Sequence, residues 1–461
     1  MASERRKKND KRQLELTIEK LDEEGIGLAA WEGKRVLVPG VLPGERILAV
    51  IEHEGQRRIA ARPLKRLTSA PERSRRWNCP HAEECLGCAL ISMDYPAQLR
   101  FKQDKVAAAL GAYPRLAQAR VAPVWAAEQP LGYRCTAKLV IGKHHGQVSI
   151  GLYRRNTHQV VDIGQCPLHH PLINQISAVV REEIERQGVW VYNPERNSGL
   201  LRYLAIRVSP SRNEAMVTFV TSERNYREIT HLAKWLVKKI PQVVSVQQNV
   251  NASTGNVILG AQTLKMLGHP ALLDQVGDLR LRISPASFFQ VNHPQAERIY
   301  ALVRQWAACR RDEHALDLYC GIGGIAMNLA RDAGQVLGIE VVEDAVRNAA
   351  DNARLNQLDN CRFRAGDAAE LLEDLELELP PGAVAVVNPP RKGCEPEVLK
   401  RLAALAPRLL LYVSCNPLTL ARDLDLLAGL GFVTEDIQPV DMFPQTPHVE
   451  CVARLVPAQG G

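Results

Sequence analysis

The chain has 461 residues, of which 46% are hydrophobic and 24% are charged, and its formal net charge is +7. These proportions are typical of a soluble globular protein with two or three domains and a core that folds without disulfides. There is no apolar run of the roughly 18 residues that a membrane helix needs, and no signal peptide is visible. We therefore expect a cytoplasmic protein without membrane contact, whose eleven cysteines stay reduced unless they bind a metal or react.

The N-terminal region, residues 1–72, is basic and strand-like. Six Lys or Arg residues stand among the first twelve, and eight stand in residues 57–76 against Glu72 alone. Such clusters attract phosphate backbones, although a single cluster fits a solvated surface equally well. Apolar residues alternate at Leu14, Leu16 and Ile18, and short apolar segments follow between glycine and proline turns. This pattern predicts a basic tail followed by a small RNA-binding β-barrel of the oligonucleotide-binding type or a relative of it.

The central region, residues 73–285, mixes both kinds of element and opens with a cysteine cluster. Its sequence predicts a mixed α+β domain with strands at 136–141, 148–153, 203–208 and 216–221 and helices at 173–187 and 228–239. Residues 95–125 are a candidate for packing on the C-terminal domain instead.

The C-terminal region, residues 286–461, alternates strands with helices from about residue 313. The predicted strands are 315–319, 335–340, 361–365, 383–387 and 409–414, and helical segments such as 343–357 and 396–405 lie between them. This alternation predicts a doubly wound, Rossmann-like α/β domain that binds ligands at the carboxyl ends of its parallel strands.

The first predicted strand runs into a glycine-rich loop, Asp-Leu-Tyr-Cys-Gly-Ile-Gly-Gly, at 317–324. Glycines there let the backbone approach a ligand closely. Glu340 ends the second strand, where a carboxylate can accept both hydroxyls of a ribose, and Asp367 follows the third, within reach of an adenine amine. The loop alone does not distinguish an S-adenosylmethionine site from a dinucleotide site.

Two further motifs follow the fourth and fifth strands: Asn-Pro-Pro-Arg-Lys-Gly at 388–393 and Ser-Cys-Asn-Pro at 414–417. Carbon 5 of uracil is a poor nucleophile, and a thiolate that adds to carbon 6 activates it for methylation. This chemistry needs a cysteine, a base and a methyl donor in one site. Cys415 stands in a polar turn that suits a reactive thiolate, and the alternative is a structural cysteine at a strand end.

Over nearly its whole length the sequence resembles the RNA uracil-5-methyltransferases of the RumA and TrmA type. The likeness is greatest to 23S rRNA enzymes with an N-terminal TRAM domain and an iron–sulfur cluster. The matching segments are 287–292, 317–324, 389–391, 413–417 and 441–450. The resemblance implies a class I methyltransferase fold, with Cys415 as nucleophile and Glu450 as the base that removes the carbon 5 proton. It further implies donor-binding residues Gln290, Tyr319, Gly321, Glu340, Asp367 and Asn388, and uracil-binding residues Phe288 and Arg391.

Asn388 departs from the family, which usually has Asp at this position. Asparagine keeps an acceptor oxygen but loses the charge. Asn-Pro-Pro is also found in adenine amino-methyltransferases, which usually follow it with an aromatic residue, whereas Arg391 follows here. Besides that rival, a non-catalytic RNA-binding protein and a nicotinamide oxidoreductase stay open as alternatives.

Three cysteines, Cys79, Cys85 and Cys88, stand close together, and Cys166 is the candidate for a fourth ligand. Four thiolates suit either zinc or a [4Fe–4S] cluster. The family resemblance, not the spacing, implies [4Fe–4S]. The other cysteines apart from Cys415 are expected to be structural.

Together these features predict an enzyme that transfers a methyl group from S-adenosylmethionine to a uracil. The expected partner is RNA, with 23S rRNA ahead of tRNA. We expect no protein partner, and a monomer is the default.

Overall fold

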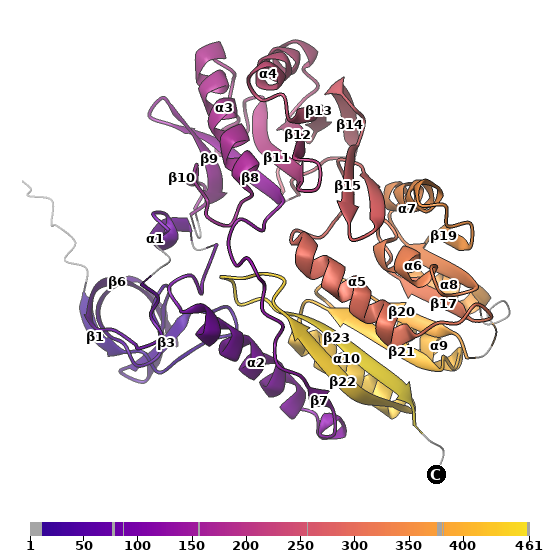
Figure 1. Cartoon of the computed structure of the whole chain (residues 1–461). Coiled ribbons are helices and arrows are strands. Elements are labelled where there is room, and N and C mark those ends of the chain that lie inside the picture. Colours follow the sequence, from indigo (N-terminus) through magenta and orange to yellow (C-terminus); the bar gives the residue numbers. More distant parts are fainter. Residues whose placement is uncertain are drawn as a thin grey trace, which may run out of the picture. The chain divides into compact units, whose positions relative to one another are not determined.

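The computed structural model of the chain describes residues 12–75, 79–85, 87–154, 157–255, 257–375, 380 and 382–458. The predicted basic tail lies outside the described residues except for Arg12, and so does Arg76 of the second basic cluster. The chain divides into two compact units (Figure 1). The first comprises Met1–Phe101 and Gln445–Pro447, and the second comprises Lys102–Pro444 and His448–Gly461.

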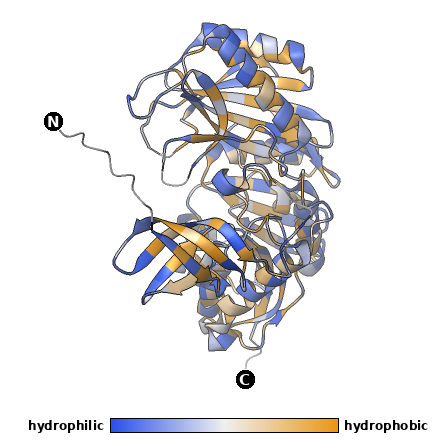
Figure 2. Cartoon of the chain, turned by 90° about the vertical axis from the view of Figure 1, so that its left-hand side faces the viewer, coloured by the Kyte–Doolittle hydropathy of each residue, from blue (hydrophilic) through white to orange (hydrophobic). Residues whose placement is uncertain are grey.

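The first unit is built around a six-stranded sheet with the order β1-β5-β6-β4-β3-β2. Its strands are β1 (Gln13–Thr17), β2 (Lys20–Leu21), β3 (Gly27–Trp31), β4 (Lys34–Val38), β5 (Arg46–Glu54) and β6 (Arg58–Thr68). Leu14, Leu16 and Ile18 are buried, as the alternation predicted, because successive side chains of a strand point to opposite faces. Figure 2 shows hydrophobic and hydrophilic residues alternating along these strands. The predicted all-β character of this region is therefore observed.

Part of the second basic cluster serves the fold of this unit. The carboxylate of Glu45 is fully buried and accepts hydrogen bonds from Arg73, at 2.5 Å from Nε and 2.7 Å from Nη2. Arg66 lies 3.2 Å from the same carboxylate. A buried carboxylate needs such partners, so we assign Arg73 a structural role as the ion-pair partner of Glu45 and not a role in phosphate binding. The unit also contains α1 (Ala82–Cys85) and the start of α2 (Tyr95–Gly111).

In the second unit, a seven-stranded sheet has the order β10-β9-β8-β11-β12-β13-β14. The strands are β8 (Thr136–His144), β9 (Gln147–Tyr153), β10 (Val160–Asp162), β11 (Leu201–Ser209), β12 (Glu214–Thr221), β13 (Val243–Val250) and β14 (Gln262–Gly268). Helices α3 (Pro171–Gln187) and α4 (Tyr226–Lys239) pack on it. All four strands and both helices predicted for this region are observed, each a few residues longer. A two-stranded sheet follows, β15 (Leu272–Val276) with β16 (Leu279–Ile283).

An eight-stranded sheet in the same unit has the order β19-β18-β17-β20-β21-β23-β22-β7. Five parallel strands form its first part: β17 (His314–Leu318), β18 (Gln335–Glu340), β19 (Cys361–Ala365), β20 (Val384–Val387) and β21 (Leu409–Ser414). The prediction of a parallel α/β sheet is confirmed for these strands. The sheet then changes direction, because β23 (Glu450–Pro457) is antiparallel to both β21 and β22 (Phe432–Val440). This antiparallel part was not predicted, and β7 (Arg120–Val121) extends it in parallel with β22.

Helices lie beside the strands of the eight-stranded sheet (Figure 1). They are α5 (His293–Ala307), α6 (Gly324–Leu329), α7 (Glu343–Leu355), α8 (Ala368–Leu375), α9 (Pro396–Ala404) and α10 (Pro417–Gly429). Two hydrophobic clusters fill the space between helices and sheet. In the part of the chain that is described, no helix is both long and apolar enough to span a bilayer.

A buried ion pair in the second unit joins α2 to the segment after β22. Lys102 and Asp441 are both fully buried and hydrogen-bonded, and the Lys102 ammonium also donates to the carbonyl of Phe443 at 3.0 Å. Burial lowers the pKa of Lys102, and the charge of Asp441 opposes this shift.

Lys102→Met is expected to lower the free energy of unfolding by about 3–5 kcal/mol, because Asp441 is left buried and unpaired. Urea denaturation measures this change. Lys400→Met, whose exposed ammonium lies 3.9 Å from Glu397, is the control and is expected to cost less than about 1 kcal/mol. Equal losses from the two substitutions would contradict the role assigned to the buried pair.

Candidate active site

Each parallel strand of the eight-stranded sheet is followed by a residue that the sequence singled out. Tyr319 follows β17, Glu340 ends β18, Asp367 follows β19, Asn388 follows β20 and Cys415 follows β21. Carboxyl ends of neighbouring parallel strands meet at one edge of a sheet. The fold therefore gathers these five residues along one edge, with the strand order reversing at β17.

The loop after β17 has a backbone that brings it close to its neighbours. Tyr319, Gly321 and Gly323 have φ values of +60°, +55° and +84°, in the left-handed region that favours glycine. A Cβ at Gly323 would lie 2.9 Å from the ring of Phe363, so only glycine fits there. The amide of Gly321 donates to the carboxylate of Glu340 at 3.1 Å, which holds the loop at the end of β18.

Backbone amides orient the two carboxylates that were predicted to bind the donor. Glu340 Oε1 accepts from the amide of Val342 at 3.0 Å, and Asp367 Oδ1 accepts from the amide of Ala369 at 2.8 Å. Asn388 is half-buried, and its backbone N–H donates to the backbone carbonyl of Leu318 at 3.2 Å. This edge therefore presents oriented acceptors of the kind that bind ribose hydroxyls and an amine.

Asp317 is a residue of this edge that the sequence analysis missed. It is fully buried in β17, and its Oδ2 accepts from the amide of Ala326 at 2.9 Å. Burial raises its pKa to about 8, and the nearby charge of Glu340 adds to this shift. A carboxylate inside an apolar strand, Ala-Leu-Asp-Leu, was the available signal, since buried charges are rare without a role.

Strand pairing brings Cys415 close to Glu450. Strands β21 and β23 pair in antiparallel register, and the last pair at this end of the ladder is Ser414 with Cys451. Cys415 directly follows Ser414 and Glu450 directly precedes Cys451, so both residues lie next to this last pair. The charge of Glu450 acts on the Cys415 thiol, in agreement with this register. A thiol and a carboxyl group from distant parts of the chain thus share one position at the sheet edge.

The electrostatic setting keeps both groups neutral in the protein without ligand. Glu450 is only 4% exposed, and burial raises its pKa to about 8, opposed by the charge of Arg391. Burial and the charge of Glu450 also raise the pKa of the half-buried Cys415 thiol. Arg391 opposes this through its charge and a hydrogen bond to the thiol. Burial and nearby cations, with Arg391 first among them, lower the pKa of His448 to about 4, so its imidazole is neutral near pH 7.

The loop that carries Arg391 is fixed from behind by α10. The carbonyl of Arg391 accepts from Asn416 Nδ2 at 3.1 Å and from the Thr419 hydroxyl at 3.2 Å. Gly393 has φ +78°, and a Cβ there would lie 2.5 Å from the carboxylate of Asp423. Asp423 is buried and accepts from the amide of Cys394 at 2.8 Å. Because α10 begins at Pro417, two residues after Cys415, its first turn connects the chain that carries the thiol to the Arg391 loop.

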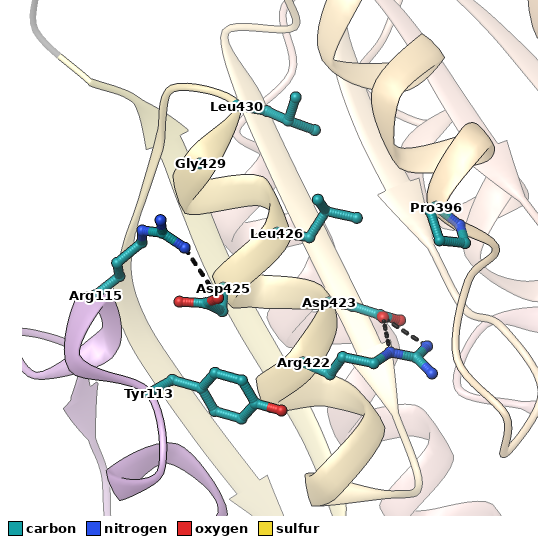
Figure 3. A pocket seen from close by; sticks show the side chains of 9 residues that line it. All are labelled: Tyr113, Arg115, Pro396, Arg422, Asp423, Asp425, Leu426, Gly429 and Leu430. Atoms are coloured by element: carbon teal, nitrogen blue, oxygen red, sulfur yellow. Dashed lines mark hydrogen bonds and ion pairs between the residues drawn. The ribbon is translucent and has the colours of Figure 1, made fainter.

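Behind this loop lies a cavity of about 460 Å³ (Figure 3). Asp423 and Asp425 of α10 line it, each held by an arginine, Arg422 and Arg115 respectively. Tyr113 and Pro396 contribute to its walls. No predicted site residue lines this cavity, and its arginines are already paired with carboxylates. We assign it no part in the candidate active site.

The segment 287–292 is held next to the chain that leads to Glu450. The side-chain amide of Asn292 donates to the carbonyl of Met442 at 3.1 Å, and that of Gln295 donates to the carbonyl of Asp441 at 3.0 Å. Gln290 is half-buried, whereas Phe288 is 71% exposed. An aromatic ring left in water at this point is available for stacking against a base.

The four cysteines proposed as metal ligands belong to different units. Cys79, Cys85 and Cys88 lie in the first unit, where Cys85 ends α1, and Cys166 lies in the second. All four are partly exposed, and four soft thiol donors suit an iron–sulfur cluster in kind. Within the described residues, no group of three or more Cys, His, Asp or Glu side chains is arranged to hold a metal ion. The cluster therefore stays a prediction.

Comparisons with known proteins identify the family of this chain. The model of the tRNA (uracil-5-)-methyltransferase family matches residues 94–456. An uncharacterised RNA methyltransferase of Geobacter sulfurreducens is 51% identical over 96% of this chain and 90% of its own length. A second, from Oceanobacillus iheyensis, is 37% identical over 95% of both chains.

Among solved structures, the tRNA (uracil-54, C5)-methyltransferase of Pyrococcus abyssi in complex with S-adenosyl-L-homocysteine is similar, with a TM-score of 0.75 and 30% identity. The match covers 96% of this chain and all of that one. S-adenosyl-L-homocysteine is the product that S-adenosylmethionine leaves after methyl transfer. The chain belongs to the tRNA (uracil-5-)-methyltransferase family and is an S-adenosylmethionine-dependent RNA methyltransferase.

Proposed function

We propose that this enzyme methylates carbon 5 of a uracil in 23S rRNA through a covalent adduct between Cys415 and carbon 6 of the base. The observation that supports the proposal is the pairing of β21 with β23, whose last pair, Ser414 with Cys451, has Cys415 and Glu450 as its neighbours. A nucleophile and a buried carboxyl group at one point of the donor edge are what uracil methylation needs.

The reaction follows from these two groups. The Cys415 thiolate attacks carbon 6, and the electrons of the carbon 5–carbon 6 double bond form an enolate. Carbon 5 then takes the methyl group from the sulfonium of the donor, which leaves as S-adenosylhomocysteine. Glu450, as a carboxylate, removes the proton from carbon 5, the double bond forms again and the thiolate is expelled. Arg391, hydrogen-bonded to the thiol, favours the thiolate at the start and end of this cycle.

The other site residues receive their proposed roles from the family resemblance. Gln290, Tyr319, Gly321, Glu340, Asp367 and Asn388 are proposed to bind the donor, and Phe288 and Arg391 the uracil. Asn388 replaces the family's usual Asp with a neutral acceptor, which keeps a hydrogen bond to the ligand and gives up a charge. The exposed ring of Phe288 supports a stacking contact with a base that has left its helix, which costs a few kcal/mol.

The proposal of an rRNA substrate is supported by the sheet of the first unit and by its exposed basic residues. A six-stranded sheet with exposed basic residues such as Arg57, Arg58, Arg62 and Lys65 supports a TRAM-like RNA-binding domain within residues 1–72. Residues 73–285 and 286–461 are the proposed central and methyltransferase domains. tRNA is the second candidate, supported by the substrate that the solved Pyrococcus abyssi relative is named for. Mapping 5-methyluridine in rRNA and tRNA from cells with and without the gene decides between them.

The mechanism is tested with RNA that contains 5-fluorouracil. Fluorine at carbon 5 cannot leave as a proton, so the methylated adduct with Cys415 cannot resolve. We expect wild-type enzyme and donor to give a protein–RNA band that survives denaturing electrophoresis. If no cellular RNA substituted in this way yields that band, the covalent mechanism is wrong.

The proposed [4Fe–4S] cluster has a direct assay. Protein purified without oxygen is expected to be brown and to hold about four iron atoms per chain. Replacing Cys79, Cys85, Cys88 or Cys166 with Ser should remove most of the iron, whereas Cys309→Ser should not. Colourless protein with stoichiometric zinc would contradict the iron–sulfur assignment.

A further inference from the structure

Helix α4 has one face in the core of the second unit and the other face in water. Four apolar residues at helical spacing are buried against the seven-stranded sheet: Ile229, Leu232, Ala233 and Leu236. Opposite them runs an exposed stripe at positions i, i+4, i+7 and i+11: Arg227, His231, Lys234 and Lys238. Three of these four residues are Arg or Lys, the fourth is a histidine, and none is acidic. An amphipathic helix needs polar residues on its outer face, but these residues do not all need to carry charge of the same sign.

Two carboxylates of the neighbouring helix α3 are paired with cations outside this stripe. Glu183 of α3 accepts from Arg186 Nε at 2.9 Å, and Lys239 reaches Glu182 at 3.3 Å. Helices α3 and α4 lie side by side (Figure 1). Among the residues that the structure describes, Arg227, Lys234 and Lys238 form no ion pair. The positive charge of these three residues is therefore available to bind an anionic partner molecule.

An aromatic side chain stands beside the stripe. Trp235 is 37% exposed, and the guanidinium of Arg186 lies over its ring at 4.3 Å from the centroid. The ammonium of Lys238 lies 5.0 Å from the same ring. Nucleic-acid bases stack on aromatic rings and on guanidinium planes without regard to sequence. Proteins that bind single-stranded nucleic acid combine a cationic surface with planar groups for stacking, which here are the Trp235 ring and the Arg186 guanidinium.

The geometry points to the outer face of α4 (Arg227, His231, Lys234, Trp235 and Lys238, with Arg186 of α3) as a second RNA-binding surface of this enzyme. Phosphates bind along the stripe, and one unpaired base stacks on Trp235 and Arg186. The elements involved belong to a different sheet from the one that carries Cys415. An RNA bound here must therefore extend beyond the target nucleotide. The inference rests on the enzyme's RNA substrate and not on which uracil is methylated.

The test compares two sets of charge removals in the full-length enzyme. The α4 variant is R227Q/K234Q/K238Q, and the matched control is R347Q/R354Q/K400Q on α7 and α9, which removes the same number of exposed positive charges. Binding is measured to a labelled single-stranded RNA of about 16 nucleotides over a series of salt concentrations. Each lost phosphate contact on a single strand lowers the slope of log affinity against log salt by about 0.7. We expect the α4 variant to lose about 2 from this slope, and the control to keep the wild-type slope.

Trp235 is tested separately. Trp235→Ala is expected to weaken binding about tenfold or more with the salt slope unchanged, because stacking is lost and no phosphate contact is. Trp235→Phe should restore most of the affinity. When R227Q/K234Q/K238Q or Trp235→Ala methylates a long transcript, the KM should be raised and the kcat unchanged.

The outcomes separate this inference from the proposed function. If wild-type enzyme methylates RNA and the α4 variant binds RNA like the control, the α4 surface does not bind RNA. Loss of a protein partner by the α4 variant, with unchanged RNA affinity, would equally overturn the inference. If the wild type forms no adduct with fluorouracil RNA, the proposed mechanism fails whatever the binding experiment shows.

Discussion

Cys415→Ala should reduce methyl transfer by roughly 10⁶-fold, as removal of a covalent nucleophile does in other enzymes. Carbon 5 of the uracil stays unreactive without addition at carbon 6, and the other thiol in a loop at this edge, Cys320, is buried. The adduct with 5-fluorouracil RNA should vanish as well. Transfer of label from radioactive S-adenosylmethionine to RNA measures the rate, and denaturing electrophoresis measures the adduct.

The matched control is Cys309→Ala. Cys309 is also a partly buried thiol, but it follows α5 and precedes β17, away from the carboxyl ends of the strands. This variant should keep both methyl transfer and adduct formation. Substantial methyl transfer by Cys415→Ala would point to attack by an amino group of the base, and with it to the adenine amino-methyltransferase alternative.

Glu450→Gln should also lose turnover but, unlike Cys415→Ala, should accumulate the adduct. Cys415 still attacks and the methyl group is still transferred, but the proton on carbon 5 has no base to accept it. Turnover should fall by about 10²–10⁴-fold, while a methylated adduct accumulates on ordinary, unfluorinated RNA. Glu435→Gln on β22 removes another partly buried carboxylate and should leave turnover intact. Normal turnover by Glu450→Gln would show that another base acts.

The same residue gives opposite pH dependences for activity and stability. Activity needs the Glu450 carboxylate and the Cys415 thiolate, so turnover should rise with pH through the Glu450 pKa of about 8. Stability runs the other way, because a carboxyl group whose pKa is raised by burial stabilises the fold below its unfolded pKa, near 4.5, and loses this contribution as pH rises through about 8.

Glu450→Gln does not titrate, so its unfolding free energy should exceed that of the wild type by an amount that grows with pH. The gain levels off above about pH 8, on the order of 5 kcal/mol at about 1.4 kcal/mol for each pKa unit. Denaturant titrations at a series of pH values measure it. A difference that does not change with pH would contradict the burial of an ionisable carboxyl group here.

The parallel strands of the methyltransferase domain could be predicted because their physical signature is local. A strand buried on both faces is a short apolar run, and β21, which is buried throughout, begins and ends where such a run predicted. The observed bounds of β18 and β19 also match the predicted ones. The donor edge followed, because ligands bind at the carboxyl ends of such strands. Cys415, Glu340 and Asp367 could thus be assigned to one edge from the order of strands and helices along the chain.

Other features depend on contacts that the sequence does not display. The antiparallel pairing of β21 with β23 joins segments that are far apart in the chain, and nothing local fixes its register. Glu450 was named through family resemblance, but its position close to Cys415 emerges only from that pairing. The burial of Asp423 was likewise not predictable, because its partner, the amide of Cys394, lies in another element.

The pairing of β21 with β23 also makes the active site sensitive to the count of residues. Side chains alternate between the two faces of a strand, so one residue inserted or deleted within Cys451–Leu455 turns Glu450 to the opposite face while the hydrogen-bonded ladder survives. Such a change should keep the fold and abolish the reaction, because Glu450 then points away from Cys415. A change of two residues restores the phase but moves the carboxylate one pleat along the strand.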